Sequence, residues 1–117
     1  MPLSACYINL DRSPHRRQHM ESQAAKIGLE GLRRFSAIDG RTLAKPDGCA
    51  ITLAELACFQ SHLQAIESSP AGDFALVMED DVELSDDLVP TLHAGQLDAL
   101  HGFDIVLLEC QPYIGSD

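Results

Sequence analysis

A short apolar run that ends in three consecutive carboxylates constrains the fold of this chain more than any other feature. Residues 74–78 read Phe-Ala-Leu-Val-Met, follow the turn-prone segment 70–73, and lead into Glu79, Asp80 and Asp81. A run this short, bounded by turn residues, predicts a buried strand rather than a helix. Ligands of α/β proteins bind at the carboxyl ends of the strands. We therefore expect the three carboxylates at a ligand-binding edge of a sheet.

Three adjacent carboxylates carry an electrostatic cost. Two unit charges about 5 Å apart repel by roughly 3 kcal/mol at an effective dielectric constant near 20. A hard divalent cation such as Mg²⁺ or Mn²⁺ would offset this repulsion, because it prefers carboxylate oxygens as ligands. A solvated acidic turn without a ligand is the competing interpretation, and the cluster by itself leaves both open.

Charge is distributed unevenly along the 117 residues, whose net charge is −10. All eight Lys and Arg residues lie within 1–50, whereas 51–117 holds thirteen of the eighteen acidic residues and no Lys or Arg. The acidic half would repel a nucleic acid, so a small phosphorylated ligand is the better candidate partner. A chain of this length that is 45% hydrophobic is expected to form one domain over 1–117.

The four cysteines show no Cys-x-x-Cys spacing, so they do not indicate a zinc or redox motif. Cys6 and Cys58 fall within apolar segments, and we expect both to be ordinary buried thiols of a protein in a reducing compartment. We recognise no secretory leader and no apolar run long enough to cross a membrane. The expected location is therefore cytoplasmic.

Strand and helix signals alternate along the chain. Apolar, β-favourable runs predict strands at 5–10, 32–38, 74–78 and 103–108. Ser13 and Pro14 predict the start of a helix that ends near Ile27, before Gly28. A further helix is expected at 87–97, with a proline in its first turn. This alternation predicts an α/β layered fold with a largely parallel sheet.

The segment 52–67 combines a capping box with helical spacing. Thr52 and Glu55 form the capping box that predicts the start of a helix. Apolar residues then recur at helical spacing and predict a stripe that faces the core: Leu56, Phe59, Leu63 and Ile66.

Polar residues follow the first predicted strand and enter the helix behind it. Asn9 and Asp11 can hydrogen-bond a base or a ribose, and Arg12 and Arg16 can bind a phosphate bidentately. A turn followed by a solvated basic helix face is the competing interpretation. Arg17 points about 100° away from Arg16 around the helix, so it should matter less for such a ligand.

Two further pairs of residues give weaker signals. Asp39 and Gly40 place a carboxylate and a flexible backbone at the end of the second predicted strand, although Asp-Gly commonly forms a plain β-turn. Ser61 and His62 lie in mid-helix outside the apolar stripe. His62 can contact a phosphate or a sugar hydroxyl there, or serve as a structural hydrogen-bonding residue.

Four of these segments form a pattern when they are read in order. They are Tyr-Ile-Asn-Leu-Asp-Arg-Ser at the start of 7–17, Phe-Ser-Ala-Ile-Asp-Gly at 35–40, Cys-x-x-Ser-His at the end of 53–62, and Val-Met-Glu-Asp-Asp-Val at 77–82. In this order they resemble glycosyltransferase family 25, which includes lipopolysaccharide and lipooligosaccharide galactosyltransferases and collagen galactosyltransferase domains.

The resemblance implies a GT-A-like (Rossmann-like) nucleotide-sugar-binding sheet with flanking helices. It implies an inverting enzyme that transfers a hexose, by analogy galactose, from a UDP-sugar to a lipopolysaccharide or other glycan acceptor. The divalent metal, Mn²⁺ or Mg²⁺, would lie at the acidic cluster, with Asp81 as the first choice for direct ligation and Glu79 or Asp80 for water-mediated or ribose contacts. The implied nucleotide-sugar contacts are Asn9, Asp11, Arg12, Arg16, Asp39, Gly40, Ser61 and His62. Inversion needs a general base, and no residue is identifiable as one.

Family domains normally continue well past the last predicted strand at 103–108. We therefore expect a sheet that is incomplete at its C-terminal side, without the acceptor part, and with an apolar edge that favours self-association. A truncated or degenerate, non-catalytic nucleotide-sugar-binding or interaction module is the alternative function. A peripheral position at a membrane surface is compatible with either.

Overall fold

The computed structural model describes residues 3–70, 74–93, 96–100, 102–106 and 108, and within them three parallel strands form one sheet. The strand order is β2–β1–β3, so β1 (Leu3–Asn9) lies in the centre. β2 (Arg33–Ser36) pairs along the second half of β1, and β3 (Phe74–Glu79) pairs along nearly all of it. The parallel α/β sheet expected from the sequence is confirmed for these three strands.

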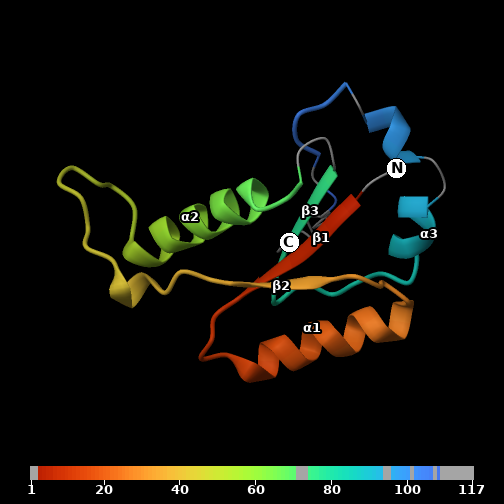
Figure 1. The fold of residues 1–117 in the computed structure, drawn as a ribbon. Coiled ribbons are helices and arrows are strands. Elements are labelled where there is room, and N and C mark those ends of the chain that lie inside the picture. Colours follow the sequence, from red (N-terminus) through yellow and green to blue (C-terminus); the bar gives the residue numbers. More distant parts are fainter. Residues whose placement is uncertain (1–2, 71–73, 94–95, 101, 107, 109–117) are drawn as a thin grey trace, which may run out of the picture.

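The two long helices cover opposite faces of the sheet (Figure 1). α1 (Pro14–Ile27) connects β1 to β2, and its buried Met20 packs with Tyr7 and Met78. α2 (Leu53–Glu67) connects β2 to β3, and its Ala65 packs with Cys6 and Ile8 on the other face. From β1 the chain passes through α1 to β2 at one edge of the sheet. It then passes through α2 to β3 on the other side of β1. The carboxyl ends of β1 and β3 therefore flank the point where the strand order reverses, which is where open α/β sheets bind ligands.

The ends of both long helices follow the local sequence signals. In α2, the backbone N–H of Glu55 donates to Thr52 Oγ1 and the Thr52 N–H donates to Glu55 Oε1, which confirms the capping box. α1 ends at Gly28, whose φ of 75° is the left-handed conformation that glycine adopts readily. Ser13 precedes α1 as expected, but its side chain makes no capping hydrogen bond.

The prediction for the buried face of α2 is wrong. Ala57, Ser61 and Ala65 are its buried residues. Phe59, by contrast, is 63% exposed, and Leu63 and Ile66 are exposed as well. The small residues, four positions apart along one face, allow the helix backbone to approach the sheet closely. The large apolar stripe therefore faces outward.

The last two predicted elements also differ from the structure. The helix expected at 87–97 is the shorter α3 (Leu88–His93), and a 3₁₀ helix, η2 (Gln96–Leu100), follows it. Residues 94–95 lie outside the described part, and glycine at position 95 lowers helix propensity by about 1 kcal/mol relative to alanine. The described residues of 102–108, which exclude Leu107, form no strand. None of them pairs with a strand of the sheet, and Ile105 is 81% exposed.

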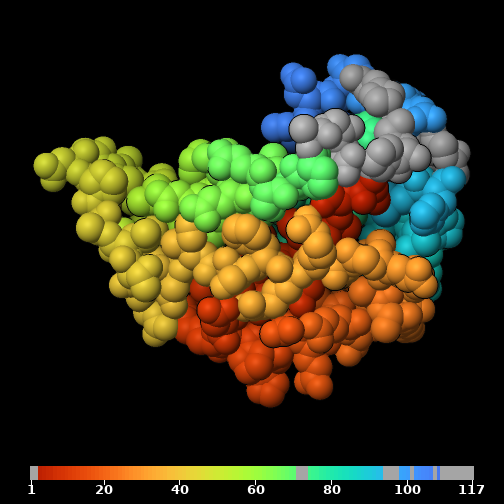
Figure 2. All heavy atoms as spheres, in the orientation of Figure 1, coloured from red at the N-terminus to blue at the C-terminus, as the bar shows by residue number. Residues whose placement is uncertain are grey.

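The space-filling view shows where the remaining segments lie (Figure 2). The loop between η1 (Gly40–Thr42) and α2 projects away from the sheet, and α3 lies at the opposite side of the molecule. In the described part of the chain, no helix has the length and apolarity needed to span a lipid bilayer.

Candidate functional site

A cleft of about 270 Å³ lies at the carboxyl ends of β1 and β3, between the residues after β1, the η1 segment and α2. Its lining combines basic, acidic and imidazole side chains with apolar ones. Of the residues predicted from the sequence, the cleft brings together Arg12, Arg16, Gly40, Ser61, His62, Glu79, Asp80 and Asp81. Asn9, Asp11 and Asp39 are not part of the lining. Asn9 and Asp39 contact lining residues, Asp80 and Arg12 respectively. Asp11 instead contacts residues outside the lining, Arg34 and Ser36.

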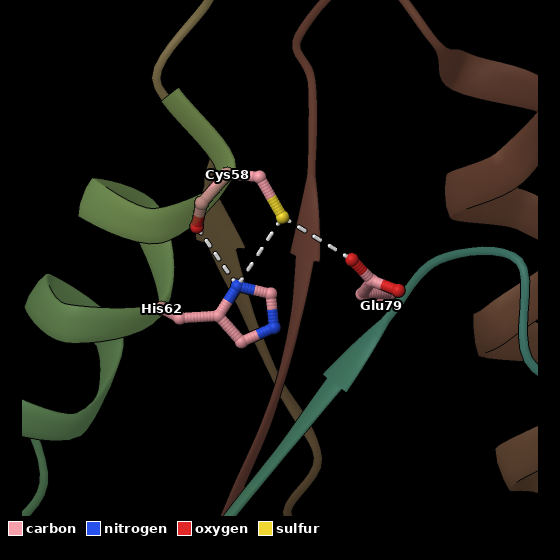
Figure 3. A group of neighbouring side chains, drawn as sticks. All are labelled: Cys58, His62 and Glu79. Carbon is pink, nitrogen blue, oxygen red and sulfur yellow. Dashed lines mark hydrogen bonds between the residues drawn. The ribbon is translucent and has the colours of Figure 1, made fainter. Parts of the chain in front are cut away.

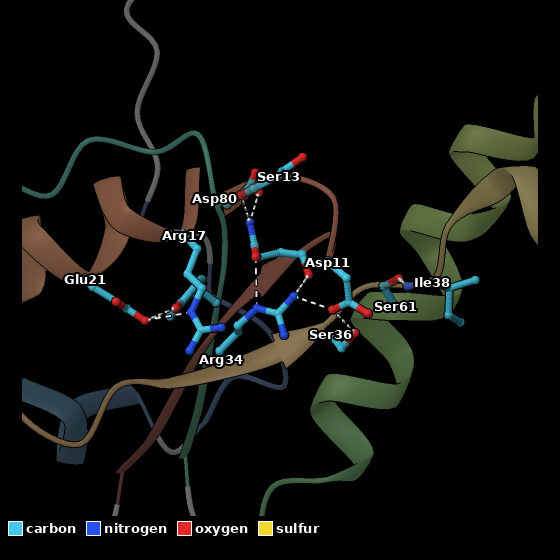
Figure 4. A network of polar contacts seen from close by, with 11 residues as sticks. Asp11, Ser13, Arg17, Glu21, Arg34, Ser36, Ile38, Ser61 and Asp80 are labelled. Atoms are coloured by element: carbon cyan, nitrogen blue, oxygen red, sulfur yellow. Dashed lines mark hydrogen bonds and ion pairs between the residues drawn. The ribbon is translucent and has the colours of Figure 1, made fainter. Parts of the chain in front are cut away.

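Asp80 is fixed in place by hydrogen bonds from β1 and α1. Figure 4 shows Asp80 beside Ser13 in the polar network. Asn9 Nδ2 donates to Asp80 Oδ2 over 2.8 Å, and both residues are buried, at 1% and 8% exposure. Arg16 Nη1 lies 3.3 Å from the other carboxylate oxygen of Asp80. Asn9 also donates to the carbonyl oxygen of Ser13. Because both its donor hydrogens are used within the protein, Asn9 supports Asp80 structurally rather than contacting a ligand directly.

Arg34 is a residue of this network that sequence reasoning did not single out. Its Nε donates to Asn9 Oδ1 over 2.9 Å, and its Nη2 donates to the Asn9 carbonyl oxygen and to Asp11 Oδ1. Ser36 also donates to Asp11, and these two hydrogen bonds lower the pKa of the Asp11 carboxyl. Arg34 lies on β2 beside β1, so only the parallel register brings it to Asn9. A pattern within one segment could not have revealed it.

Arg12 and Asp39 connect the loop after β1 to the start of η1. Arg12 Nε donates to Asp39 Oδ2 over 2.9 Å. Asp39 caps η1 by accepting from the Arg41 N–H, and it also pairs with the Arg41 guanidinium. The two guanidinium groups and the backbone N–H hold the pKa of the Asp39 carboxyl well below its usual range. Asp39 thus positions Arg12 at the cleft.

Gly40 of η1 and Ser61 of α2 make the close contacts between the segment 38–42 and α2. A Cβ at Gly40 would lie 2.9 Å from the carbonyl oxygen of Leu53, which real side chains do not tolerate. Ser61 Oγ donates to the Ala57 carbonyl oxygen over 2.7 Å and accepts from the Ile38 N–H over 2.9 Å. At 1% exposure, Ser61 is a structural contact, so the expectation that its hydroxyl meets a ligand is not supported by its geometry.

Cys58, His62 and Glu79 form a compact group on one wall of the cleft (Figure 3). Cys58 Sγ lies 3.3 Å from Glu79 Oε1, to which it donates, and 3.6 Å from His62 Nδ1. Cys58 is exposed, which corrects the expectation of a buried thiol, whereas Cys6 is buried as expected. Partial desolvation and the carboxylates of Glu79 and Asp81 raise the pKa of the Cys58 thiol. The thiol proton is therefore retained at neutral pH.

Asp81 differs from the two acids before it. Its side chain is exposed at the cleft and makes no hydrogen bond or ion pair within the part of the chain that the structure describes. The carboxylate retains its full capacity to accept a cation or a hydroxyl donor.

Arg17 lies away from the cleft, as its helical position predicts. Its Nε pairs with Glu21, which also accepts a hydrogen bond from the Tyr7 hydroxyl (Figure 4). The two neighbouring arginines of α1 therefore have separate partners, Asp80 for Arg16 and Glu21 for Arg17.

A comparison with models of known protein families found a match over most of the chain. The model of glycosyltransferase family 25, described as LPS biosynthesis protein, matches residues 4–109. A search of curated proteins and a search of solved structures each found no match. The matched span begins at the second residue of β1 and contains β2, β3, both long helices and every residue of the cleft.

Proposed function

Because the chain belongs to glycosyltransferase family 25 of LPS biosynthesis, we propose that its cleft binds the donor, a UDP-hexose and specifically UDP-galactose. The observation that carries the proposal is the meeting of two arginines and three carboxylates where the strand order reverses. We further propose that the sheet is the nucleotide-binding part of a GT-A fold. The acceptor in this proposal is a lipopolysaccharide glycan.

Arg12 and Arg16 are the proposed phosphate contacts. Each makes one ion pair through a single nitrogen, Arg12 with Asp39 and Arg16 with Asp80. The remaining guanidinium N–H groups of both side chains, which are more than half exposed, can face a diphosphate in the cleft. Asp39 and Asp80 orient these guanidinium groups and do not need to touch the ligand.

The carboxylates fit a hard divalent cation, with unequal roles. Asp81 and Glu79 present oxygen atoms at the cleft, and oxygen ligands suit Mg²⁺ and Mn²⁺. Asp80 is already held by Asn9 and neutralised by Arg16, so we assign it to positioning and Asp81 to direct ligation. A bound cation would neutralise charge on the diphosphate leaving group. In the same pocket, His62 stays available for a sugar or phosphate oxygen.

The test is UDP affinity measured by calorimetry with Mn²⁺ at fixed salt. Arg16→Ala should weaken UDP binding about ten- to a hundredfold, because a charge-assisted contact is worth about 1.5–3 kcal/mol. Arg12→Ala should weaken it in the same range. Arg17→Ala is the matched control, since Arg17 pairs with Glu21 outside the cleft, and it should leave affinity within about twofold. Asp81→Asn should remove the Mn²⁺ dependence.

Two results would contradict the proposal. Equal, small losses for all three arginine variants would mean a diffuse basic surface instead of a donor site. Unchanged Mn²⁺-dependent binding by Asp81→Asn would remove the acidic cluster from the site. UDP binding without release of UDP from UDP-galactose in the presence of a lipopolysaccharide acceptor would identify a non-catalytic binding module.

A further inference from the structure

We propose that Cys58, His62 and Glu79 form a second metal site in the cleft, one that takes Zn²⁺ in preference to Mg²⁺ or Mn²⁺. The three side chains offer sulfur, nitrogen and oxygen ligand atoms within 4.8 Å of one another. Thiolate and imidazole are softer ligands than carboxylate and favour Zn²⁺. The site does not depend on the proposed sugar-donor function.

The two separations from Cys58 Sγ match those of tetrahedral zinc. Zn–S, Zn–N and Zn–O bonds of about 2.3, 2.05 and 2.0 Å place ligand atoms about 3.5 Å apart across a tetrahedral angle. Cys58 Sγ lies 3.6 Å from His62 Nδ1 and 3.3 Å from Glu79 Oε1. All three ligand atoms lie within 4.8 Å of one another, so rotation of the His62 ring and the Glu79 carboxylate can complete the site around a zinc ion.

Two elements set this arrangement. Cys58 and His62 are one helical turn apart on α2, so they project from the same face, and Glu79 ends β3 opposite them (Figure 3). Three protein ligands leave the fourth position of a tetrahedral ion open, as in catalytic rather than structural zinc sites. That position faces the cleft, where a water molecule or an oxygen atom of a bound ligand can occupy it.

Zinc binding displaces protons from the Cys58 thiol and from Nδ1 of His62. His62 Nδ1 lies 2.9 Å from the Cys58 carbonyl oxygen, a contact in which Nδ1 carries the proton and donates it. Ligation through Nδ1 moves that proton to Nε2, and ligation by sulfur releases the Cys58 thiol proton to solvent. Glu79 binds as its carboxylate. Zinc thus replaces two hydrogen bonds, from Cys58 to Glu79 and from His62 to the Cys58 carbonyl oxygen, with three metal–ligand bonds.

Cobalt substitution tests the site directly, because Co²⁺ bound to a thiolate gives a charge-transfer absorption that oxygen or imidazole ligation does not. The full chain titrated with Co²⁺ should show this band saturating at one equivalent, and Zn²⁺ should abolish it. Cys58→Ser should lose the band. Cys49→Ser is the matched control, because Cys49 lies in the loop before α2 outside the cleft, and it should keep the band.

Zinc affinity measured by competition with a chromophoric chelator tests the other two ligands. His62→Gln and Glu79→Gln should each weaken Zn²⁺ binding at least tenfold, with far-ultraviolet circular dichroism confirming the fold. A band that persists in Cys58→Ser, or that never appears in the unmodified chain, overturns the site. Full zinc affinity in both the His62 and Glu79 variants does so as well. Asp81→Asn should keep the cobalt band while losing Mn²⁺-dependent UDP binding, so the two proposals can fail separately.

Discussion

Asn9, the last residue of β1, donates a 2.8 Å hydrogen bond to Asp80, the first residue after β3, and both side chains are buried. The contact joins residues 71 positions apart in sequence across the point where the strand order reverses. Arg34 holds the acceptor side of the Asn9 amide, so the donor side faces Asp80. The orientation of the acidic cluster therefore depends on a residue of the neighbouring strand.

Asn9→Ala should destabilise the protein by about 2–3 kcal/mol, because the buried Asp80 carboxylate loses the donor on its Oδ2 and Arg34 Nε loses its acceptor. Urea unfolding with an unchanged m-value measures this loss. Arg17→Ala breaks only the exposed pair with Glu21 and should cost much less stability, because solvent screens such a pair. Equal losses of stability for the two substitutions would argue against a structural role of Asn9.

Gly40→Ala should destabilise the contact between η1 and α2 by about 1–3 kcal/mol, because the new methyl group meets the Leu53 backbone. The Leu53 backbone cannot move away from this methyl group as a flexible side chain could. Gly102→Ala is the matched control, since a Cβ there meets open space and φ is not in the left-handed region. Thermal unfolding of the two variants compares the costs. A neutral Gly40→Ala would show that η1 shifts freely.

Asp39→Asn should change how stability depends on pH. The folded-state pKa of Asp39 lies below its ordinary value because of Arg41 and Arg12, so its contribution to stability is present near neutral pH and is lost as the pH falls below about 5. The stability difference between the parent chain and the variant should therefore shrink toward acid. Urea midpoints measured from pH 7 to pH 3 test this, and a constant difference would contradict it.

Substitutions on the buried and exposed faces of α2 should differ in how much they change stability. Ala65→Leu inserts volume against Cys6 and Ile8 and should cost about 1–3 kcal/mol. Phe59→Ser removes an exposed side chain and should change stability by no more than about 0.5 kcal/mol. Chemical denaturation of both variants is the measurement. The reverse ranking would mean that Phe59, not Ala65, faces a core.

Self-association remains a prediction, and the exposed face of α2 now gives it a location. Phe59, Leu63 and Ile66 are exposed together on one helix, and such a face loses unfavourable contact with water when it is covered. Phe59→Glu should shift sedimentation toward the monomer, with Arg17→Ala as a surface control. A strictly monomeric parent chain at high concentration would contradict the prediction.

Local sequence signals predicted the three strands of the sheet, the ends of the long helices and the sheet edge at which the cleft lies, but they also predicted a strand at 103–108 that the described residues do not form. Strand runs, a capping box and a helix-ending glycine act over a few residues, so they can be read in one segment. The carboxyl ends of parallel strands meet at one sheet edge, which is why residues after β1 and β3 could be assigned to one site in advance.

Tertiary structure alone decided which side chains face the cleft and which hold it together. The small residues of α2 face the sheet, and most of its large apolar residues do not. Small side chains let the helix backbone approach the sheet closely, which the spacing of apolar residues along the helix does not reveal. Asn9 faces Asp80, Arg34 reaches Asn9 from another strand, and Cys58 of α2 contacts Glu79 of β3. These contacts join residues 71, 25 and 21 positions apart, so no spacing within a single segment encodes them.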